Sequence, residues 1–146
     1  MAGDPAARVP SYDELYAEIE RLEPGVTGEI LEPGVLRVMP RPGRPHRRAH
    51  LELARLLGSF DVAHRGRGWW IESEAEIRLG VRLVVPDLAG WRVERVPDFP
   101  DESPITIVPD WCCEVLSPSN ARDDRRVKLP LYAREGVGHV WLVEPE

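Results

Sequence analysis

Two carboxylates, Asp87 and Glu114, stand among apolar residues in segments that the sequence predicts to be strands. Side chains alternate along a strand, so Asp87 ends an apolar row that begins at Leu83, and Glu114 shares a face with Cys112. Burying an unpaired carboxylate costs several kcal/mol, so each needs a cation, a metal ion or a set of hydrogen-bond donors. On neighbouring strand ends, two carboxylates would form an oxygen-rich site suited to Mg²⁺ or Mn²⁺.

The chain contains eighteen arginines but a single lysine, Lys128, which indicates a position that needs a compact ammonium group. Asp124, Lys128 and Tyr132 follow one another at four-residue spacing, so a helix would place them on one face. A purely structural alternative stays open at this point. In that interpretation Glu114 is a satisfied carboxylate at a strand end, and Lys128 is the partner of Asp124.

Periodicity and capping signals predict the helices that would position these residues. The expected helices are 12–22, where Ser11 and Glu14 form a capping-box pattern, 45–59, which has a broad apolar face, and the segment "SPSNARDDRRVKLPLYARE", which Pro130 should bend or split.

The expected strands are a hairpin at 27–32 and 34–39, the alternating segment "GWWIESEAEIRL", the more apolar "VRLVVPDLAGW", then "ITIVPDWCCEVL", entered or interrupted at Pro109, and a last strand after Gly136. Residues 92–104 are polar and rich in proline, which predicts a loop. This order predicts an α/β (α+β) fold, with a mixed β-sheet flanked by helices.

Length and composition narrow the class of protein. A chain of 146 residues is long enough for one domain with a buried core, and no apolar run is long enough to span a bilayer. The first residues lack the pattern of a signal peptide, so we expect a cytoplasmic protein. The only cysteines, Cys112 and Cys113, are adjacent and would point to opposite faces of a strand, which argues against a disulfide framework or a metal cluster.

The net charge of −6 argues against a protein that coats nucleic acid, but the charge is unevenly distributed. Between Arg37 and Arg67 there are eight arginines and two acidic residues, a local excess of +6. Such a segment can form a phosphate-facing patch on an acidic body. A solvated loop and helix start is an equally acceptable interpretation of "RPGRPHRR".

Nearly the whole chain resembles the Uma-two family of restriction-type endonucleases, which is placed in the PD-(D/E)xK nuclease superfamily. The matching segments are "SYDELY", "GEILEPGVLRVMPRPGRPHRRAH", "VPDLAGW", "PDWCCEVLSPSNARDD", "KLPLYAREGV" and "HVWLVEP". The segment "EVLSPS", together with the Asp124, Lys128, Tyr132 and Gly136 that follow it, is the most specific part. Family members usually continue beyond this point, so the resemblance also implies a single endonuclease-like domain that lacks a C-terminal extension and leaves a sheet edge without its cover.

The resemblance implies a restriction-endonuclease-like core, with an N-terminal helix and β-hairpin, in which Asp87, Glu114 and the backbone carbonyl of Val115 bind Mg²⁺ or Mn²⁺. Pro-Asp dipeptides also occur at Asp98, in the loop, and at Asp110, at a strand entrance, which leaves Asp87 as the best ligand. The superfamily's usual lysine position is occupied by Leu116, and Lys128 matches a lysine moved to the following helix.

Six further positions are expected near this site or its substrate. Glu29 matches a family position and is either an additional site carboxylate or a surface residue of the hairpin. His46 and His50 are four residues apart, a spacing that could hold a metal, but we expect them to face phosphate or solvent. Possible phosphate contacts come from Arg44, Arg47 and Arg48.

The implied activity is metal-dependent hydrolysis of phosphodiester bonds in nucleic acid, most simply DNA, by an endonuclease. Lys128 would orient the attacking water or offset charge in the transition state, and its replacement by alanine is expected to abolish cleavage with little effect on folding. The alternative is a catalytically inert nuclease-fold module that binds nucleic acid or self-associates. A homodimer is expected, and the five tryptophans are interpreted as core and interface residues rather than as a base-stacking platform.

Overall fold

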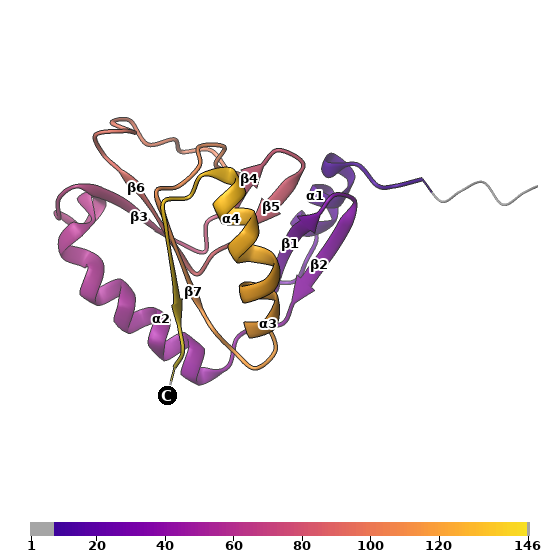
Figure 1. The fold of residues 1–146 in the computed structure, drawn as a ribbon, viewed down its shortest axis with the longest axis horizontal. Coiled ribbons are helices and arrows are strands. Elements are labelled where there is room, and N and C mark those ends of the chain that lie inside the picture. The colour runs from indigo at the N-terminus through magenta and orange to yellow at the C-terminus, as the bar shows by residue number, and fades with distance from the viewer. Residues whose placement is uncertain (1–7, 146) are drawn as a thin grey trace, which may run out of the picture.

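The computed structural model describes residues 8–145, which form two four-stranded sheets packed together with helices (Figure 1). The helical segments in chain order are α1 (Tyr12–Glu20), α2 (Arg44–Leu57), two 3-10 turns (Gly58–Phe60 and Val62–His64), α3 (Ala121–Asp123), a π-helical turn (Asp124–Lys128) and α4 (Leu129–Glu135). The strands are β1 (Thr27–Glu32), β2 (Val35–Met39), β3 (Trp69–Ser73), β4 (Ile77–Leu79), β5 (Arg82–Val84), β6 (Leu88–Arg92), β7 (Trp111–Val115) and β8 (His139–Val143). The predicted α/β class, with sheets flanked by helices, is confirmed.

The first sheet has the order β2-β1-β5-β4 and is antiparallel throughout. Helix α1 begins as the capping pattern predicts, with the Ser11 hydroxyl accepting a hydrogen bond from the backbone N–H of Glu14. Leu15 of this helix packs on Ile30 and Leu83. The predicted N-terminal helix and hairpin therefore form one unit with β4 and β5.

The second sheet has the order β3-β6-β7-β8, in which β7 and β8 are parallel and the other pairs antiparallel. Different helices pack on its two faces, as the contacts of the adjacent cysteines of β7 show. Cys113 packs in a cluster with Leu53 and Leu57 of α2, whereas Cys112 packs in a cluster with Tyr132 of α4. Figure 1 shows α2 and α4 on either side of β7. Both thiols are buried and unbridged.

Two of the predicted strands are wrong, because each is divided between the two sheets. "GWWIESEAEIRL" breaks at Glu74, whose φ of 53° no strand adopts, into β3 and β4. "VRLVVPDLAGW" breaks at Val85–Asp87 into β5 and β6, because Pro86 has no backbone donor for a ladder. The breaks lie side by side, since the N–H of Glu74 donates to the carbonyl of Asp87 over 3.1 Å. Asp87 therefore lies at the junction of the sheets and not on a strand.

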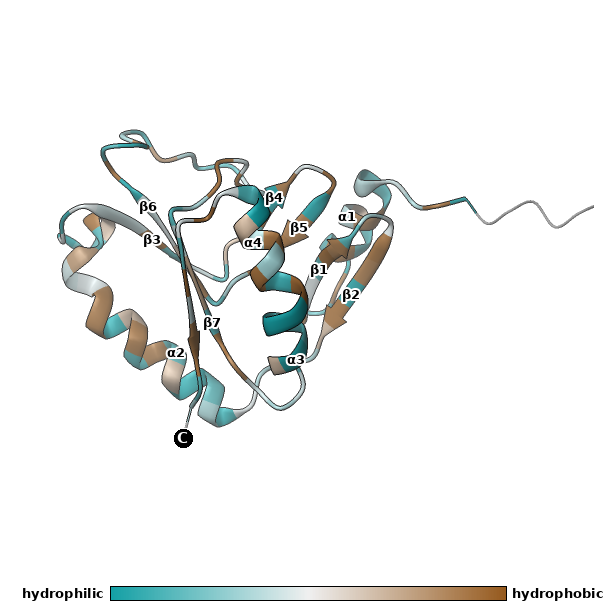
Figure 2. Ribbon diagram, in the orientation of Figure 1, coloured by the Kyte–Doolittle hydropathy of each residue, from teal (hydrophilic) through white to brown (hydrophobic). Residues whose placement is uncertain are grey.

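The last predicted helix is divided, as expected, but not by a simple bend at Pro130. The irregular turn precedes the proline, which occupies the first turn of α4 where its missing N–H is not needed. Figure 2 shows this π-helical turn as one of the most hydrophilic parts of the chain. Two of its polar residues, Asp124 and Lys128, are nevertheless buried. Within residues 8–145, no helix is both long and apolar enough to cross a membrane.

Candidate active site

Four segments that are distant in sequence bring their charged residues to one small cavity at the junction of the sheets. It encloses about 50 Å³, room for a few water molecules, and its walls include His46, Asp87, Glu114, Asp124 and Lys128. Asp87 comes from the break between β5 and β6, Glu114 from β7, and Asp124 and Lys128 from the π-helical turn. The three residues that the sequence predicts to be catalytic, Asp87, Glu114 and Lys128, therefore line one cavity.

Lys128 is the centre of this cluster. Its Nζ lies 2.6 Å from Oε1 of Glu114 and 2.9 Å from Oε2 of Glu29. The hydroxyl of Tyr132 donates to the same Glu114 oxygen over 2.6 Å. The structural alternative paired Lys128 with Asp124. That pairing is wrong, because the ion pairs of Lys128 are with Glu29 and Glu114.

Glu29 is an interior residue, so the alternative of a surface role on the hairpin is wrong. Its exposed fraction is 0%, and Oε2 accepts a hydrogen bond from the backbone N–H of Val85 over 2.8 Å. Its other oxygen, Oε1, is buried and has no partner in the described part of the chain. Oδ2 of Asp124 is likewise buried and has no hydrogen-bond partner among the described residues. Asp124 lines the polar cavity, and Glu29 pairs with Lys128, which also lines it. The two unpartnered oxygens therefore favour a ligand that supplies positive charge to this cluster.

Asp87 is held by two donors. Its Oδ2 accepts from the backbone N–H of Val115 over 2.7 Å, and its Oδ1 lies 3.1 Å from Nε2 of His46. The expectation that His46 faces phosphate or solvent is wrong, since only 6% of it is exposed. His50 is different, because its Nε2 lies 2.8 Å from the hydroxyl of Ser73.

A sequence signal for the burial of His46 existed. Ala49, Leu53 and Leu57 follow it at helical spacings of three, seven and eleven residues, which places His46 on the apolar stripe of α2. A histidine on such a stripe packs inward, where Nε2 of His46 contacts Asp87. Leu116, at the usual lysine position of the superfamily, is buried and apolar.

Burial among like charges controls the electrostatics. Burial raises the pKa of Glu114 to about 8 against the opposing pull of Lys128, and the carboxylates of Glu29 and Asp87 raise it further. Burial likewise raises the pKa of Asp124 to about 6, again opposed by Lys128. Burial would lower the pKa of Lys128, but Glu114 and Glu29 outweigh it and hold the pKa above its ordinary value. Lys128 is therefore an ammonium in a cluster with more acid than base.

The donor set fits a divalent metal ion in its chemistry. Carboxylate oxygens are the ligands that Mg²⁺ and Mn²⁺ prefer, and a dication would relieve the excess of negative charge. Across residues 8–145, however, no three histidine, cysteine, aspartate or glutamate side chains already form an arrangement that holds a metal ion. Asp87 and Glu114 now accept hydrogen bonds from protein donors, so metal binding requires them to exchange or share those donors.

The three arginines expected to contact phosphate are exposed but differ in their surroundings. Arg47 donates to the carbonyl of Pro42 and lines a hollow that has His46 as a common wall with the carboxylate cavity. Arg48 pairs with Glu52 at 2.9 Å. Arg44 and Arg48 line a separate depression beside Pro145. Of the three, Arg47 is best placed for a substrate at the cluster.

Replacing Lys128 by alanine should strongly destabilise the fold, contrary to the expectation from sequence. The change would leave Glu29 and Glu114 buried without their cation, which typically costs about 3–5 kcal/mol. Urea unfolding measures this loss, and Arg126→Ala, an exposed change in the same turn, should stay within about 0.5 kcal/mol of the parent. Equal stability of the two variants would contradict the buried ion pairs.

Asp124→Asn should change the pH dependence of stability in the metal-free protein. The folded protein holds the Asp124 proton up to about pH 6, whereas the unfolded chain releases it near the ordinary value of 3.8. Unfolding therefore releases a proton between these values, and the contribution of Asp124 to the free energy of unfolding falls as the pH rises.

The asparagine variant has no proton to release at this position, so its free energy of unfolding does not fall for this reason. Its stability relative to the parent should therefore increase from about pH 4 to pH 6, by on the order of 3 kcal/mol. Unfolding curves at several pH values, with a chelator present, make the comparison. Parallel pH profiles of parent and variant would show that the burial of Asp124 has no such effect.

Comparison with known proteins identifies a family and a shared fold. Residues 11–146 match the model of the Uma2 family, whose description is "Putative restriction endonuclease". A similar solved structure is the crystal structure of a "putative nuclease belonging to DUF820" from Anabaena variabilis ATCC 29413, with a TM-score of 0.74 and 22% sequence identity. The similarity covers 92% of this chain and 74% of that chain, and at this identity it shows a shared fold. No curated protein matches the sequence. Because the family model covers nearly the whole sequence, this chain belongs to the Uma2 family.

Proposed function

We propose that this protein is a metal-dependent endonuclease that hydrolyses phosphodiester bonds of DNA. The observation that carries the proposal is that Asp87, Glu114 and Asp124 line one cavity together with Lys128, whose buried ammonium also pairs with Glu29 behind the cavity wall. A cluster with more carboxylates than cations, and with two unpartnered oxygens, is costly in a structural core. Membership in a family whose description is "Putative restriction endonuclease" supports a catalytic reason for keeping this cluster despite its energetic cost.

In this proposal Asp87, Glu114 and the backbone carbonyl of Val115 hold Mg²⁺ or Mn²⁺. When bound, the ion would polarise the scissile phosphate and lower the pKa of the attacking water. His46 orients Asp87 through the contact between Nε2 and Oδ1. Glu29 and Tyr132 hold Lys128 and Glu114 in fixed positions.

Lys128 has the remaining role in this mechanism. An ammonium has three N–H donors, and the two ion pairs of Lys128 account for two of them. The third could orient the attacking water or contact a phosphate oxygen, where charge develops during the reaction. The fixed position of the ammonium lowers the reorganisation needed at that moment.

The DNA backbone would approach through the hollow beside His46. Its walls include Arg41, Arg47 and His50, and it shares Pro42, His46 and Glu74 with the carboxylate cavity. Contacts of arginine with phosphate are independent of sequence and sensitive to salt. The cytoplasmic location and the homodimer expected from the sequence stay predictions.

The second candidate function is an inert nuclease-fold module that binds nucleic acid. Leu116 at the usual lysine position favours it, as does the lack of preformed three-ligand metal geometry within the described residues. The two candidates differ in metal binding, because only the endonuclease requires it.

Mn²⁺ should bind to the parent protein and should bind at least about tenfold more weakly to Asp87→Asn, as loss of one ligand charge implies. Isothermal titration without DNA measures this directly and does not depend on choosing the right substrate. Asp98→Asn is the matched control, because Asp98 is an exposed loop residue that also follows a proline. Equal binding to all three proteins, or to none, would favour the inert module.

Arg47→Gln should weaken binding of duplex DNA and lower the slope of log affinity against log salt by about one, because one phosphate contact is lost. Arg134→Gln makes the same change of charge at an exposed position of α4 and should leave both quantities unchanged. Fluorescence anisotropy over a salt series provides the values. If the two variants behaved alike, Arg47 would have no specific contact with the backbone.

A further inference from the structure

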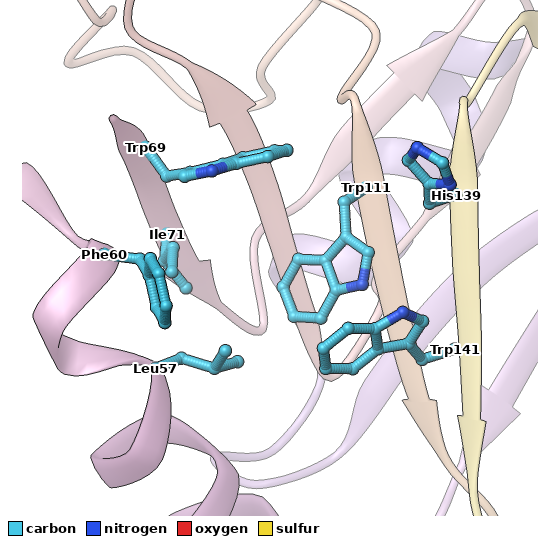
Figure 3. A pocket seen from close by; sticks show the side chains of 7 residues that line it. All are labelled: Leu57, Phe60, Trp69, Ile71, Trp111, His139 and Trp141. Atoms are coloured by element: carbon cyan, nitrogen blue, oxygen red, sulfur yellow. The ribbon is translucent and has the colours of Figure 1, made fainter. Parts of the chain in front are cut away.

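An aromatic pocket lies on the second sheet (Figure 3). It encloses about 350 Å³ and is lined by Leu57, Phe60, Trp69, Ile71, Trp111, His139 and Trp141. These residues come from the end of α2, the turn after it, and β3, β7 and β8. It shares no lining residue with the carboxylate cavity.

The rings of this pocket are arranged to receive a flat, largely apolar group. Trp111 and Trp141 meet edge to face, with centroids 5.1 Å apart and planes at 78°. Figure 3 shows Phe60 and Ile71 facing these two indoles across the hollow, with Trp69 beside them. About half of Phe60 and of Trp141 is exposed, at 51% and 46%. Large aromatic residues exposed around a concave surface typically mark a binding site.

Basic residues adjoin the aromatic pocket on two sides, of which Arg55 pairs with Glu52 and Arg92 with Glu94. Phe60 is also a wall of a neighbouring hollow that is lined by Arg55, Arg65 and Arg67. On another side, the guanidinium of Arg92 lies 5.3 Å from the centroid of the Trp69 ring. The pocket therefore combines aromatic walls with guanidinium groups at its edge.

Backbone hydrogen bonds hold the turn that carries Arg65 and Arg67. The N–H of Gly66 donates to the carbonyl of Asp61 over 2.6 Å, and the N–H of Arg67 donates to the carbonyl of Ser59 over 3.2 Å. A side chain at position 66 would lie 2.6 Å from the backbone of Asp61, so only glycine permits this close approach. The two arginines consequently project from a preorganised turn.

We propose that the aromatic pocket binds an unpaired nucleobase of single-stranded or locally opened nucleic acid, while Arg65 and Arg67 contact the adjoining phosphates. A nucleobase has flat faces that stack on aromatic rings, and it is always attached to a charged backbone. Aromatic walls with a basic rim match both properties. This inference goes beyond the proposed endonuclease activity, because it requires neither metal nor cleavage. It replaces, for Trp69, Trp111 and Trp141, the interpretation from sequence that the tryptophans do not stack on bases.

The charge of the rim also distinguishes this ligand from a second copy of the chain. In a two-fold symmetric dimer the same patch meets itself, so Arg65, Arg67 and Arg92 of one copy would approach those of the other. Nucleic acid supplies the opposite charge. The pocket adjoins Leu57 at the end of α2, whereas His46 is near its beginning, roughly 17 Å away at 1.5 Å per residue. The two sites are also on different faces of β7, because Trp111 packs with Cys113 on the α2 side, whereas Glu114 shares the α4 side with Cys112.

Binding of two labelled oligonucleotides tests this proposal, with a chelator present so that no cleavage occurs. One is a short oligothymidylate, and the other is an abasic strand of equal length and charge. The parent should bind the base-bearing strand at least about fivefold more tightly, because stacking contributes to its affinity alone. The double variant Phe60→Ala, Trp141→Ala should lose this preference, whereas Leu56→Ala, an exposed change on α2 that does not line the pocket, should keep it.

Further variants separate the parts of the proposal. Arg65→Gln together with Arg67→Gln should weaken binding of both strands, and Arg134→Gln should weaken neither. Asp87→Asn should retain the preference for bases even if it abolishes metal binding, so failure of the endonuclease proposal would not affect this result. Circular dichroism of each variant verifies folding.

The proposal is overturned by equal binding of the two strands, by no binding of either, or by a preference that survives in the folded double variant. It is also overturned if sedimentation shows a parent dimer that Trp141→Ala dissociates without changing strand preference. That result would assign the aromatic pocket to self-association.

Discussion

The buried ammonium of Lys128 is the interaction on which the rest of the site depends. It joins Glu29 of the first sheet to Glu114 of the second, so one cation links two sheets and the π-helical turn. Without it, both glutamates would be unpaired in a low-dielectric interior. The π-helical turn makes this interaction possible, since it directs both Asp124 and Lys128 into the interior from one five-residue segment. π-helical turns often occur at functional sites.

The crossings between the sheets explain why Asp87 is available at all. The chain leaves the second sheet after β3, forms the hairpin of β4 and β5 in the first sheet, and returns as β6. Asp87 occupies the return crossing, where its carboxylate caps the N–H of Val115 and contacts His46. A regular strand through this point would have placed its backbone in a ladder. The break instead opens the polar cavity between the sheets.

Much of this arrangement could be predicted from local patterns. The N-cap at Ser11, the hairpin around Pro33–Gly34 and the stripe of Asp124, Lys128 and Tyr132 depend on neighbours in sequence, and the structure confirms them. The other half of the predicted capping box differs, because the Glu14 carboxylate pairs with Arg8. The division of the two central segments could not be predicted, because hydrophobic alternation continues across Glu74 and Asp87 while the chain changes sheets. The partners of Glu29 and His46 depend on contacts between distant segments, which periodicity does not encode. The metal ligands and the substrate stay predictions.

The central claim is that this cluster exists to bind a metal ion. Anomalous diffraction from crystals grown with Mn²⁺ tests it most directly, because it locates the ion as well as detecting it. The proposal predicts an anomalous peak within coordination distance of the carboxylates of Asp87 and Glu114, at the cavity bounded by Lys128. A fully formed cluster with no peak, or a peak only at surface residues such as His64, would contradict it.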